Sequence, residues 1–249
     1  MDLNLKGKVA IVTGGSKGIG KAITRALAEE GVNVAICARG LEELQKTAKE
    51  IADGTRTKIL PMQADVKKID NIKSLVSSTV KEFGGLDILV NNAASTIRGS
   101  ILELSDEAWY NRFDGKVMGY IRCAREAVPH MIQRGGGRIV NIAGTAARSA
   151  TSDTAAANGV ANASVANVTK FLSDDLAKHG ILVNCVHPGA VPTTPRAEQI
   201  AAQNLPPIGR VVRPAELADL VVFLCSVKAS AITGQAICVD GGRGRAICY

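Results

Sequence analysis

A glycine-rich turn near the N-terminus constrains this chain more than any other feature. The short apolar run "KVAIVT" leads through "GGSKGIG" into the amphipathic run "KAITRALAEEG", which predicts a strand, a tight turn and a helix. Glycines at this spacing let the backbone approach a pyrophosphate, and the helix N-terminus offers N–H groups to phosphates. The segment predicts a dinucleotide-binding loop, with a turn that serves packing alone as the alternative. The residues of this loop are Gly14, Ser16, Lys17, Gly18, Ile19 and Gly20.

Strand-like and helix-like runs alternate along the rest of the chain. Continuous apolar strands with helical crossovers indicate a parallel sheet covered on both faces. No linker or repeat divides the 249 residues, so we predict that residues 1–249 form one α/β domain. The expected fold is a Rossmann-like doubly wound domain with a seven-stranded, mainly parallel sheet and long helices at about 105–134 and 154–179. The other strand candidates are residues 32–38, 57–63, 86–91, 137–143, 181–187 and 236–240.

Composition and charge narrow the possible partners. The net charge is +7, but the 30 Lys and Arg residues are scattered and aromatic residues make up only 3%, so we expect no nucleic-acid binding. No apolar run approaches the length that spans a membrane, so we expect no membrane-spanning segment and no membrane partner. Six cysteines without a C-x-x-C pair favour the cytoplasm, and no His, Cys and carboxylate cluster has metal-ligand spacing. We therefore expect a cytoplasmic protein without a metal site.

The end of the second strand candidate indicates which dinucleotide would bind. Ala38 and Arg39 stand where an enzyme selective for NAD usually places an acid against the ribose 2′-hydroxyl. Arg39 can instead form a forked contact with a 2′-phosphate, and Lys17 adds a second cation. The pattern favours NADP(H) over NAD(H) and leaves occupancy of the site open. Two solvated surface cations are the alternative.

Taken together, the motifs resemble those of the short-chain dehydrogenase/reductase family over nearly the whole chain. "TGGSKGIG" is similar to that family's cofactor loop, Asp65-Val66 to the pair beside adenine, and "NNAA" to its Asn-Asn-Ala-Gly, with Ala94 replacing the glycine. "HPGAVPT" is similar to the Pro-Gly segment after the sixth strand. The resemblance implies further cofactor contacts from Asp65, Val66, Asn92, Ala93, Pro188, Gly189 and Thr193.

The same resemblance implies a catalytic tetrad of Asn, Ser, Tyr and Lys, which this chain lacks at the matching positions. Seven residues beyond Trp109, where the family places asparagine, stands Lys116. Gly144 occupies the serine position, with Thr145 one residue later. Counting back from "TKFLSDDLAKHGI" places Asn158 at the tyrosine and Asn162 at the lysine. None of the three tyrosines is followed four residues later by a lysine.

These replacements lead to the interpretation that we favour from the sequence. An amide has no titratable proton near neutral pH, so Asn158 cannot replace a tyrosine that gives and takes one. We expect a pseudoenzyme, inactive alone, that forms the non-catalytic subunit of a heterotetrameric NAD(P)-dependent alcohol dehydrogenase or ketoreductase. Its partner would be a paralogue carrying the tetrad, and a homotetramer is the alternative.

The competing hypothesis is an enzyme with a non-standard site. Lys116 in a cleft can have its pKa lowered into a useful range, and Thr145 supplies a hydroxyl. Asn158 and Asn162, one helical turn apart, can hold a carbonyl oxygen. The chain would then be an NADP(H)-dependent oxidoreductase, or a lyase or isomerase. We expect His187 to be a packed loop residue, and Glu42 and Glu43 to lie on a solvated helical face.

Overall fold

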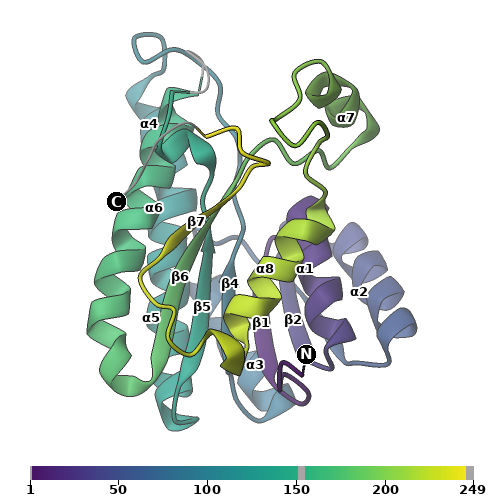
Figure 1. Ribbon diagram of the computed structural model, residues 1–249. Coiled ribbons are helices and arrows are strands. Elements are labelled where there is room, and N and C mark those ends of the chain that lie inside the picture. The colour runs from purple at the N-terminus through teal and green to yellow at the C-terminus, as the bar shows by residue number, and fades with distance from the viewer. Residues whose placement is uncertain (1, 151–154, 245–249) are drawn as a thin grey trace.

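The computed structural model describes residues 2–150 and 155–244, which form a seven-stranded sheet in the order β3-β2-β1-β4-β5-β6-β7 (Figure 1). Every pair of neighbouring strands is parallel. The predicted single Rossmann-like α/β domain is therefore confirmed, and all seven strand candidates are strands. Their bounds are β1 (Val9–Thr13), β2 (Asn33–Ala38), β3 (Ile59–Gln63), β4 (Ile88–Asn91), β5 (Gly137–Ile142), β6 (Ile181–Pro188) and β7 (Ala236–Val239).

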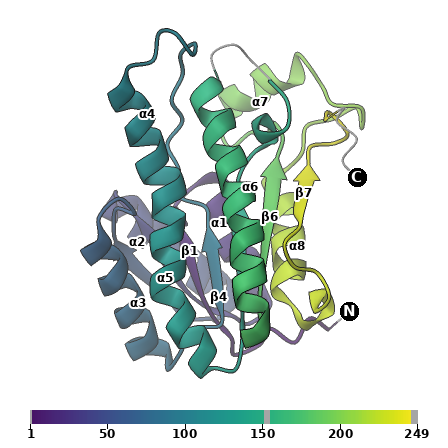
Figure 2. The same cartoon turned by 90° about the vertical axis from the view of Figure 1, so that its left-hand side faces the viewer.

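Helices cover both faces of the sheet. One face carries α1 (Gly18–Glu29), α2 (Leu41–Thr55) and α8 (Pro214–Cys225). The other face carries α3 (Ile69–Phe83), α4 (Asp106–Phe113), α5 (Gly119–Gln133) and α6 (Ala156–Leu176), seen from the front in Figure 2. The remaining α7 (Pro195–Ala202) lies beyond the carboxyl ends of the strands (Figure 1). Among the described helices, none has the length and apolar character needed to cross a membrane.

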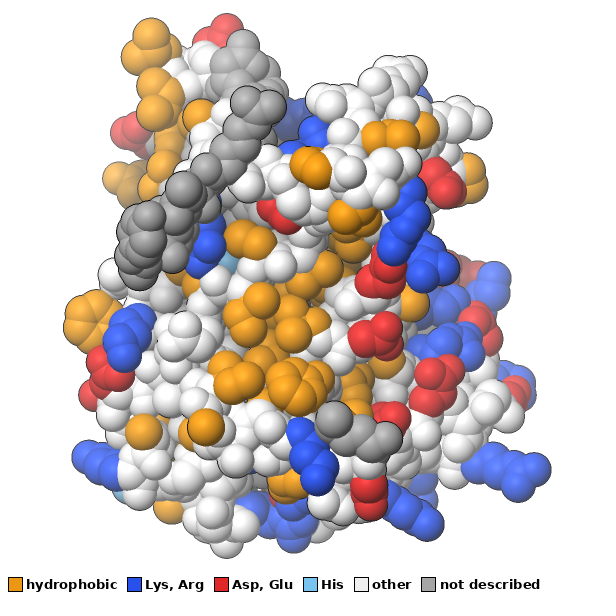
Figure 3. All heavy atoms as spheres, in the orientation of Figure 1, with side chains coloured by type: hydrophobic (Ala, Val, Ile, Leu, Met, Phe, Trp, Pro, Cys, Tyr) orange, Lys and Arg blue, Asp and Glu red, His pale blue; other side chains and the backbone are white. Residues whose placement is uncertain are grey.

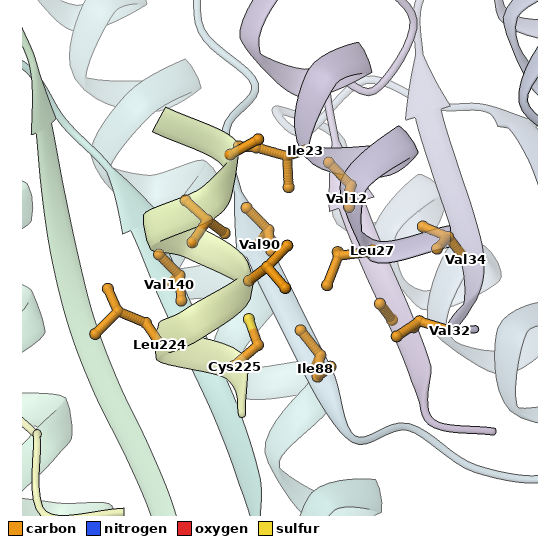
Figure 4. Close-up of a cluster of buried hydrophobic side chains, with 14 of the residues drawn as sticks. Val12, Ile23, Leu27, Val32, Val34, Ile88, Val90, Val140, Leu224 and Cys225 are labelled. Carbon is orange, nitrogen blue, oxygen red and sulfur yellow. The ribbon is translucent and has the colours of Figure 1, made fainter. Parts of the chain in front are cut away.

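Because apolar residues occupy both faces of the strands, each strand contributes to two cores. In β1, Val12 faces α1 and α8, whereas Ile11 faces the helices of the opposite side. Figure 4 shows the first of these cores, where Leu27 of α1 and Leu224 of α8 lie over the sheet. The glycine-rich turn follows β1 directly, so this packing fixes its position.

The long helix predicted over residues 105–134 is not continuous. A π-helical segment, η1 (Asp114–Met118), separates α4 from α5. A π-helix holds one more residue in its turn than an α-helix, and such segments are frequent at functional sites. The predicted helix over residues 154–179 is α6 followed by a short 3-10 turn, η3 (Ala177–His179), and its predicted start at residue 154 lies outside the described residues.

A chain of buried amide and hydroxyl groups connects the sheet to α6. Asn91 Nδ2 donates to Asn141 Oδ1 at 2.9 Å, and Asn141 Nδ2 donates to Thr169 Oγ1 at 2.9 Å. All three side chains are buried. Buried polar groups are costly unless they are paired, so this chain of bonds aligns α6 with the ends of β4 and β5.

Replacing Thr169 by valine should therefore destabilise the fold. Thr169→Val preserves the branched shape but leaves the buried Asn141 Nδ2 without its acceptor, which costs about 1–3 kcal/mol. Thr169→Ser keeps the acceptor and should cost clearly less. Urea unfolding of the three proteins measures the difference, and equal stability of the two variants would contradict this role for the hydroxyl.

Candidate functional site

A cleft of about 450 Å³ lies at the carboxyl ends of the strands on the β1–β3 side of the sheet. The turn after β1, the end of β2 and the segments after β3 and β4 form its walls. In doubly wound sheets ligands bind at this edge, near the point where the strand order reverses, which here lies between β1 and β4. The structure brings seven predicted cofactor residues together in the lining of this cleft: Gly14, Ser16, Lys17, Arg39, Asp65, Val66 and Ala93.

The glycine-rich turn has the backbone shape that its sequence predicts. Gly14 and Gly18 have φ angles of 68° and 55°, which side chains rarely adopt. At Gly20 a Cβ would lie 2.1 Å from the carbonyl oxygen of Gly14. Helix α1 begins at Gly18, its N-cap Lys17 makes no capping hydrogen bond, and its first turn has no acidic residue. The turn and the helix start are therefore suited to an anion.

Asn92 supports this turn from β4. Its Nδ2 donates to the carbonyl oxygens of Thr13 and Gly14 at 3.0 and 3.2 Å, and Thr13 Oγ1 accepts from the backbone N–H groups of Asn92 and Ala93. Asn92 is a predicted cofactor contact, and its side-chain hydrogen bonds hold the loop itself. Contact with a bound cofactor stays a prediction for this residue.

Besides Gly18 and Gly20 of the turn, four further predicted cofactor residues lie outside the lining of the cleft. Thr193 packs against the turn, because a Cβ on Gly18 would lie 2.9 Å from its Cγ2. Pro188 ends β6, and the backbone N–H of Gly189 donates to the carbonyl of Val239 at 3.0 Å. Ile19 is half-buried and packs on the core under α1. Cofactor contact stays a prediction for all four.

Two charged residues line the cleft that were not predicted to lie there. Lys67 lines the cleft and donates from Nζ to Asn111 Oδ1 at 3.0 Å. Glu43 also lines it, with its carboxylate 3.7 Å from Lys17 Nζ. We had assigned Glu43 to a solvated helical face, but the start of α2 turns it toward the glycine loop. The available signal was its place in the first turn of α2, close behind the end of β2.

Lys116 lies in η1 with its side chain in the protein interior. The residue is 3% exposed, and Nζ donates to Tyr120 Oη at 2.8 Å and to the Ile142 carbonyl at 2.5 Å. Tyr120 Oη also donates to this carbonyl, at 2.9 Å. Burial, reinforced by the charge of Arg112, lowers the pKa of Lys116 to about 7. Burial raises the pKa of Tyr120 well above its ordinary value, so the phenol stays protonated. Lys116 is therefore a buried amine that titrates near neutral pH.

Asn158 and Asn162 have different surroundings although both lie on α6. The amide of Asn158 binds the backbone of Ile97, donating from Nδ2 to its carbonyl at 2.6 Å and accepting from its N–H at 3.4 Å. Asn162 is 6% exposed, and its Oδ1 is buried without a hydrogen-bond partner among the described residues. A Cβ on Gly144 would lie 2.6 Å from Asn162 Nδ2, so residues 144 and 162 are in contact, as predicted for one site.

Thr145 and His187 lie beside Gly144. Thr145 is half-buried and begins a 3-10 turn, η2 (Thr145–Ala147). His187 is fully buried, with Nδ1 2.8 Å from the Gly144 carbonyl and Nε2 3.5 Å from Cys185 Sγ. The prediction that it packs is confirmed, but its assignment to a loop is wrong, because β6 continues to Pro188 and pairs with β7 there. Burial lowers the pKa of His187.

Comparison with known proteins places this geometry in a family. Residues 14–243 match the family described as Enoyl-(Acyl carrier protein) reductase. The 3-oxoacyl-acyl-carrier-protein reductase FabG of Staphylococcus aureus is 35% identical over 241 residues, covering 94% of this chain and 97% of that protein. The chain belongs to the short-chain dehydrogenase/reductase family. Among the described residues, no group of three or more His, Cys, Asp or Glu side chains is placed to hold a metal ion.

Solved structures agree with this assignment. L-sorbose reductase from Gluconobacter frateurii, complexed with NADPH and L-sorbose, superposes with a TM-score of 0.93 at 33% identity over 99% of this chain and 100% of that one. A variant of actinorhodin polyketide ketoreductase with NADPH superposes with a TM-score of 0.88 at 36% identity over 96% and 98% of the two chains.

These relatives overturn the interpretation that we favoured from the sequence. The comparisons do not support a non-catalytic pseudoenzyme subunit. The relatives that match along nearly the whole chain are named as reductases. The pseudoenzyme was inferred from the missing tyrosine. The burial of Lys116, which lowers its pKa, was not visible in the sequence. The comparisons support the competing reading of an oxidoreductase. The heterotetrameric partner belonged to the rejected interpretation, and the state of assembly stays a prediction.

The lowered pKa of Lys116 predicts a pH dependence of stability. Because its folded pKa of about 7 lies below the value of 10.5 for an ordinary lysine, the unfolded chain binds more protons between these values. The free energy of unfolding should thus rise with pH in this window, by at most about 1.4 kcal/mol per pH unit from this group.

Urea unfolding between pH 7 and 8.5 tests this expectation, since above pH 9 ionising thiols of the unfolded chain act in the opposite direction. Lys116→Met should flatten the rise, whereas Lys178→Met, at an exposed position, should leave it unchanged. A wild-type slope that persists in Lys116→Met would contradict the assigned pKa.

Proposed function

We propose that this chain is an NADP(H)-dependent oxidoreductase that interconverts a ketone and an alcohol, with a non-standard proton-transfer site built on Lys116. The observation that carries the proposal is the place of Lys116, because the preceding residue Gly115 lines the dinucleotide cleft; burial lowers the pKa of the Lys116 amine to about 7. Relatives named as reductases, two of them solved with NADPH, support it. In this proposal the hydride still passes between cofactor and substrate, and only the group that transfers the proton differs from the tyrosine that the family resemblance implies.

The cleft has the features that NADP(H) requires. The left-handed glycines and the uncapped start of α1 suit a pyrophosphate, and Asp65 and Val66 lie where the family resemblance places the adenine. Asn162 offers a buried Oδ1 that has no hydrogen-bond partner in the described part of the chain, an acceptor for a ribose hydroxyl. When bound, the cofactor would supply or accept the hydride.

Selectivity for the phosphorylated cofactor would rest on Arg39, opposed by Glu43. Arg39 is exposed at the end of β2 and lines the cleft beside Lys17. Glu43 lies 3.7 Å from Lys17 and would repel a 2′-phosphate. With both side chains partly exposed, solvent weakens this ion pair, so a phosphate can compete for Lys17.

Lys116 would act as the proton donor in reduction. Its ammonium form, which prevails below a pH of about 7, gives a proton to the developing alkoxide, and the neutral amine takes one back in the oxidation direction. The Ile142 carbonyl and Tyr120 hold Nζ in place. Tyr120 itself is a poor donor because its pKa is raised.

The same proposal explains how the chain departs from the tetrad that its family resemblance implies. The tyrosine position is held by Asn158, whose amide is occupied with Ile97 and so positions the segment after β4. Gly144 carries no hydroxyl, and Thr145 would orient the carbonyl in its place. Lys116 would thus transfer the proton, and Thr145 would position the substrate carbonyl.

For assembly we propose a homotetramer. Several large apolar side chains on the outer surface of α4, η1 and α6 are exposed: Tyr110, Met118, Val160 and Phe171. Figure 3 shows a further apolar area over β7 and α8. Two separate apolar surfaces suit two isologous contacts, and native mass spectrometry of the purified chain tests the resulting stoichiometry.

Cofactor selectivity can be measured by calorimetry. We expect NADPH to bind at least about tenfold more tightly than NADH, since a charge-assisted phosphate contact contributes about 1.5–3 kcal/mol. Arg39→Gln should remove most of this preference. Glu43→Gln should tighten NADPH, while Glu42→Gln, on the neighbouring exposed position, should not. Equal affinities of the wild-type chain for both nucleotides would contradict the assignment of Arg39.

Ketone reduction with NADPH tests the role of Lys116. We expect kcat to fall as pH rises through about 7, because the donor is the protonated amine, and the oxidation rate to rise over the same range. Lys116→Met should reduce kcat by at least about 100-fold, in line with the loss of a general acid. If Lys116→Met retains the wild-type rate and pH profile, another group transfers the proton.

A further inference from the structure

A second pocket lies at the opposite edge of the sheet, where the strands begin. It has a volume of about 300 Å³ and is formed by the segment before β1, the start of β4 and the loop between α5 and β5. Figure 1 shows this edge at the bottom, beside the mark of the N-terminus and away from α4 and α7. The pocket shares no lining residue with the dinucleotide cleft and has no part in the function proposed above.

Positive charge dominates the lining of this pocket. It contains the three cations Lys8, Arg134 and Arg138, but Asp87 is the only carboxylate among its described residues. Lys8 Nζ and Arg134 Nη2 both lie 3.3 Å from Asp87 Oδ1. Asp87 also accepts from the backbone N–H of Val9, which fixes its carboxylate at the start of β1. Lys8 and Arg134 thus share the carboxylate of Asp87, and no described carboxylate forms an ion pair with Arg138.

Arg138 is the cation that most lacks an acceptor. Its one hydrogen bond in the described structure runs from Nη1 to the carbonyl of Gly137, at 2.9 Å. Its Nε is buried without a partner. Cys225, which also lines the pocket, provides no negative charge, because burial raises the pKa of its thiol to about 12. A partly buried guanidinium with an unused donor is destabilising unless an external acceptor reaches it.

The glycines between the two arginines leave room for such an acceptor. Gly136 and Gly137 are closely packed, since a Cβ on either would lie within 2.8 Å of Gly180 or Met131. Gly135 is different, because nothing lies within 4 Å of the Cβ position there. Its φ angle of 80° is one that asparagine and aspartate tolerate better than other side chains. The pocket is therefore closed at Gly136 and Gly137 and open at Gly135.

We propose that this pocket binds a small phosphate-bearing molecule. Three cations less one carboxylate leave two positive charges, which match the charge of about −2 on a phosphate monoester. A tetrahedral phosphate accepts hydrogen bonds from several directions, as donors on Lys8, Arg134 and Arg138 require, and arginine is well suited to phosphate. The volume is at the lower end of the range for small-molecule sites, which limits the ligand to a compact metabolite.

Paired substitutions at the open glycine test the proposal. Gly135→Asp and Gly135→Asn are nearly identical in shape and in backbone preference, but only the first adds a negative charge to the pocket. Thermal unfolding is followed with increasing inorganic phosphate, against sodium chloride at the same ionic strength. A ligand that binds the folded state raises the melting temperature as its concentration exceeds its Kd. Phosphate held at the glycine-rich turn of the dinucleotide cleft would contribute equally to both variants.

We expect phosphate to stabilise the wild-type chain and Gly135→Asn alike, and Gly135→Asp to weaken its apparent affinity by about tenfold or more. Arg138→Gln should weaken it similarly, measured as the phosphate-dependent shift relative to its own baseline in chloride. Identical phosphate responses of Gly135→Asp and Gly135→Asn, or no phosphate response of the wild-type chain beyond that of chloride, would overturn the proposal.

Discussion

The side-chain amide of Asn92 joins two strands at the place where the order of the sheet reverses. By donating to the backbone of Thr13 and Gly14, it holds the turn after β1 against the segment after β4. β1 and β4 are parallel partners as far as Val12 and Val90, and Asn92 continues the contact beyond these residues, where the chain leaves toward α1 on one side and α4 on the other. The shape of the cleft, the start of α1 and the position of the segment that reaches Ile97 all depend on this contact.

Most of the fold could be predicted from the sequence because its signals are local. Apolar runs of strand length separated by helix-length segments were sufficient to place all seven strands, and the glycine spacing predicted the turn at Gly14 and Gly18. The interruption of the helix at η1 was not predictable, because Asp114–Met118 has no proline or other local signal of a π-turn.

The candidate site was harder to predict than the fold, because its chemistry depends on environment. Sequence position alone brought Lys116, Gly144 and Asn162 into one region, and the contact between residues 144 and 162 agrees with this. The pKa of Lys116, however, follows from burial and from Arg112, and neither can be judged before the chain is folded. Glu43 shows the same limitation, since whether a helical carboxylate faces solvent or a cleft depends on how α2 leaves β2.

The close approach of Gly144 and Asn162 also bears on how such a chain can change over evolutionary time. A side chain introduced at residue 144 would have its Cβ 2.6 Å from Asn162 Nδ2, so even serine is obstructed while Asn162 keeps its present position. Residue 162 must be replaced, or must rotate away, before a hydroxyl at residue 144 becomes neutral. The two positions are therefore coupled: any side chain at residue 144 requires the amide end of Asn162 to move, and the end of a flexible side chain can do so.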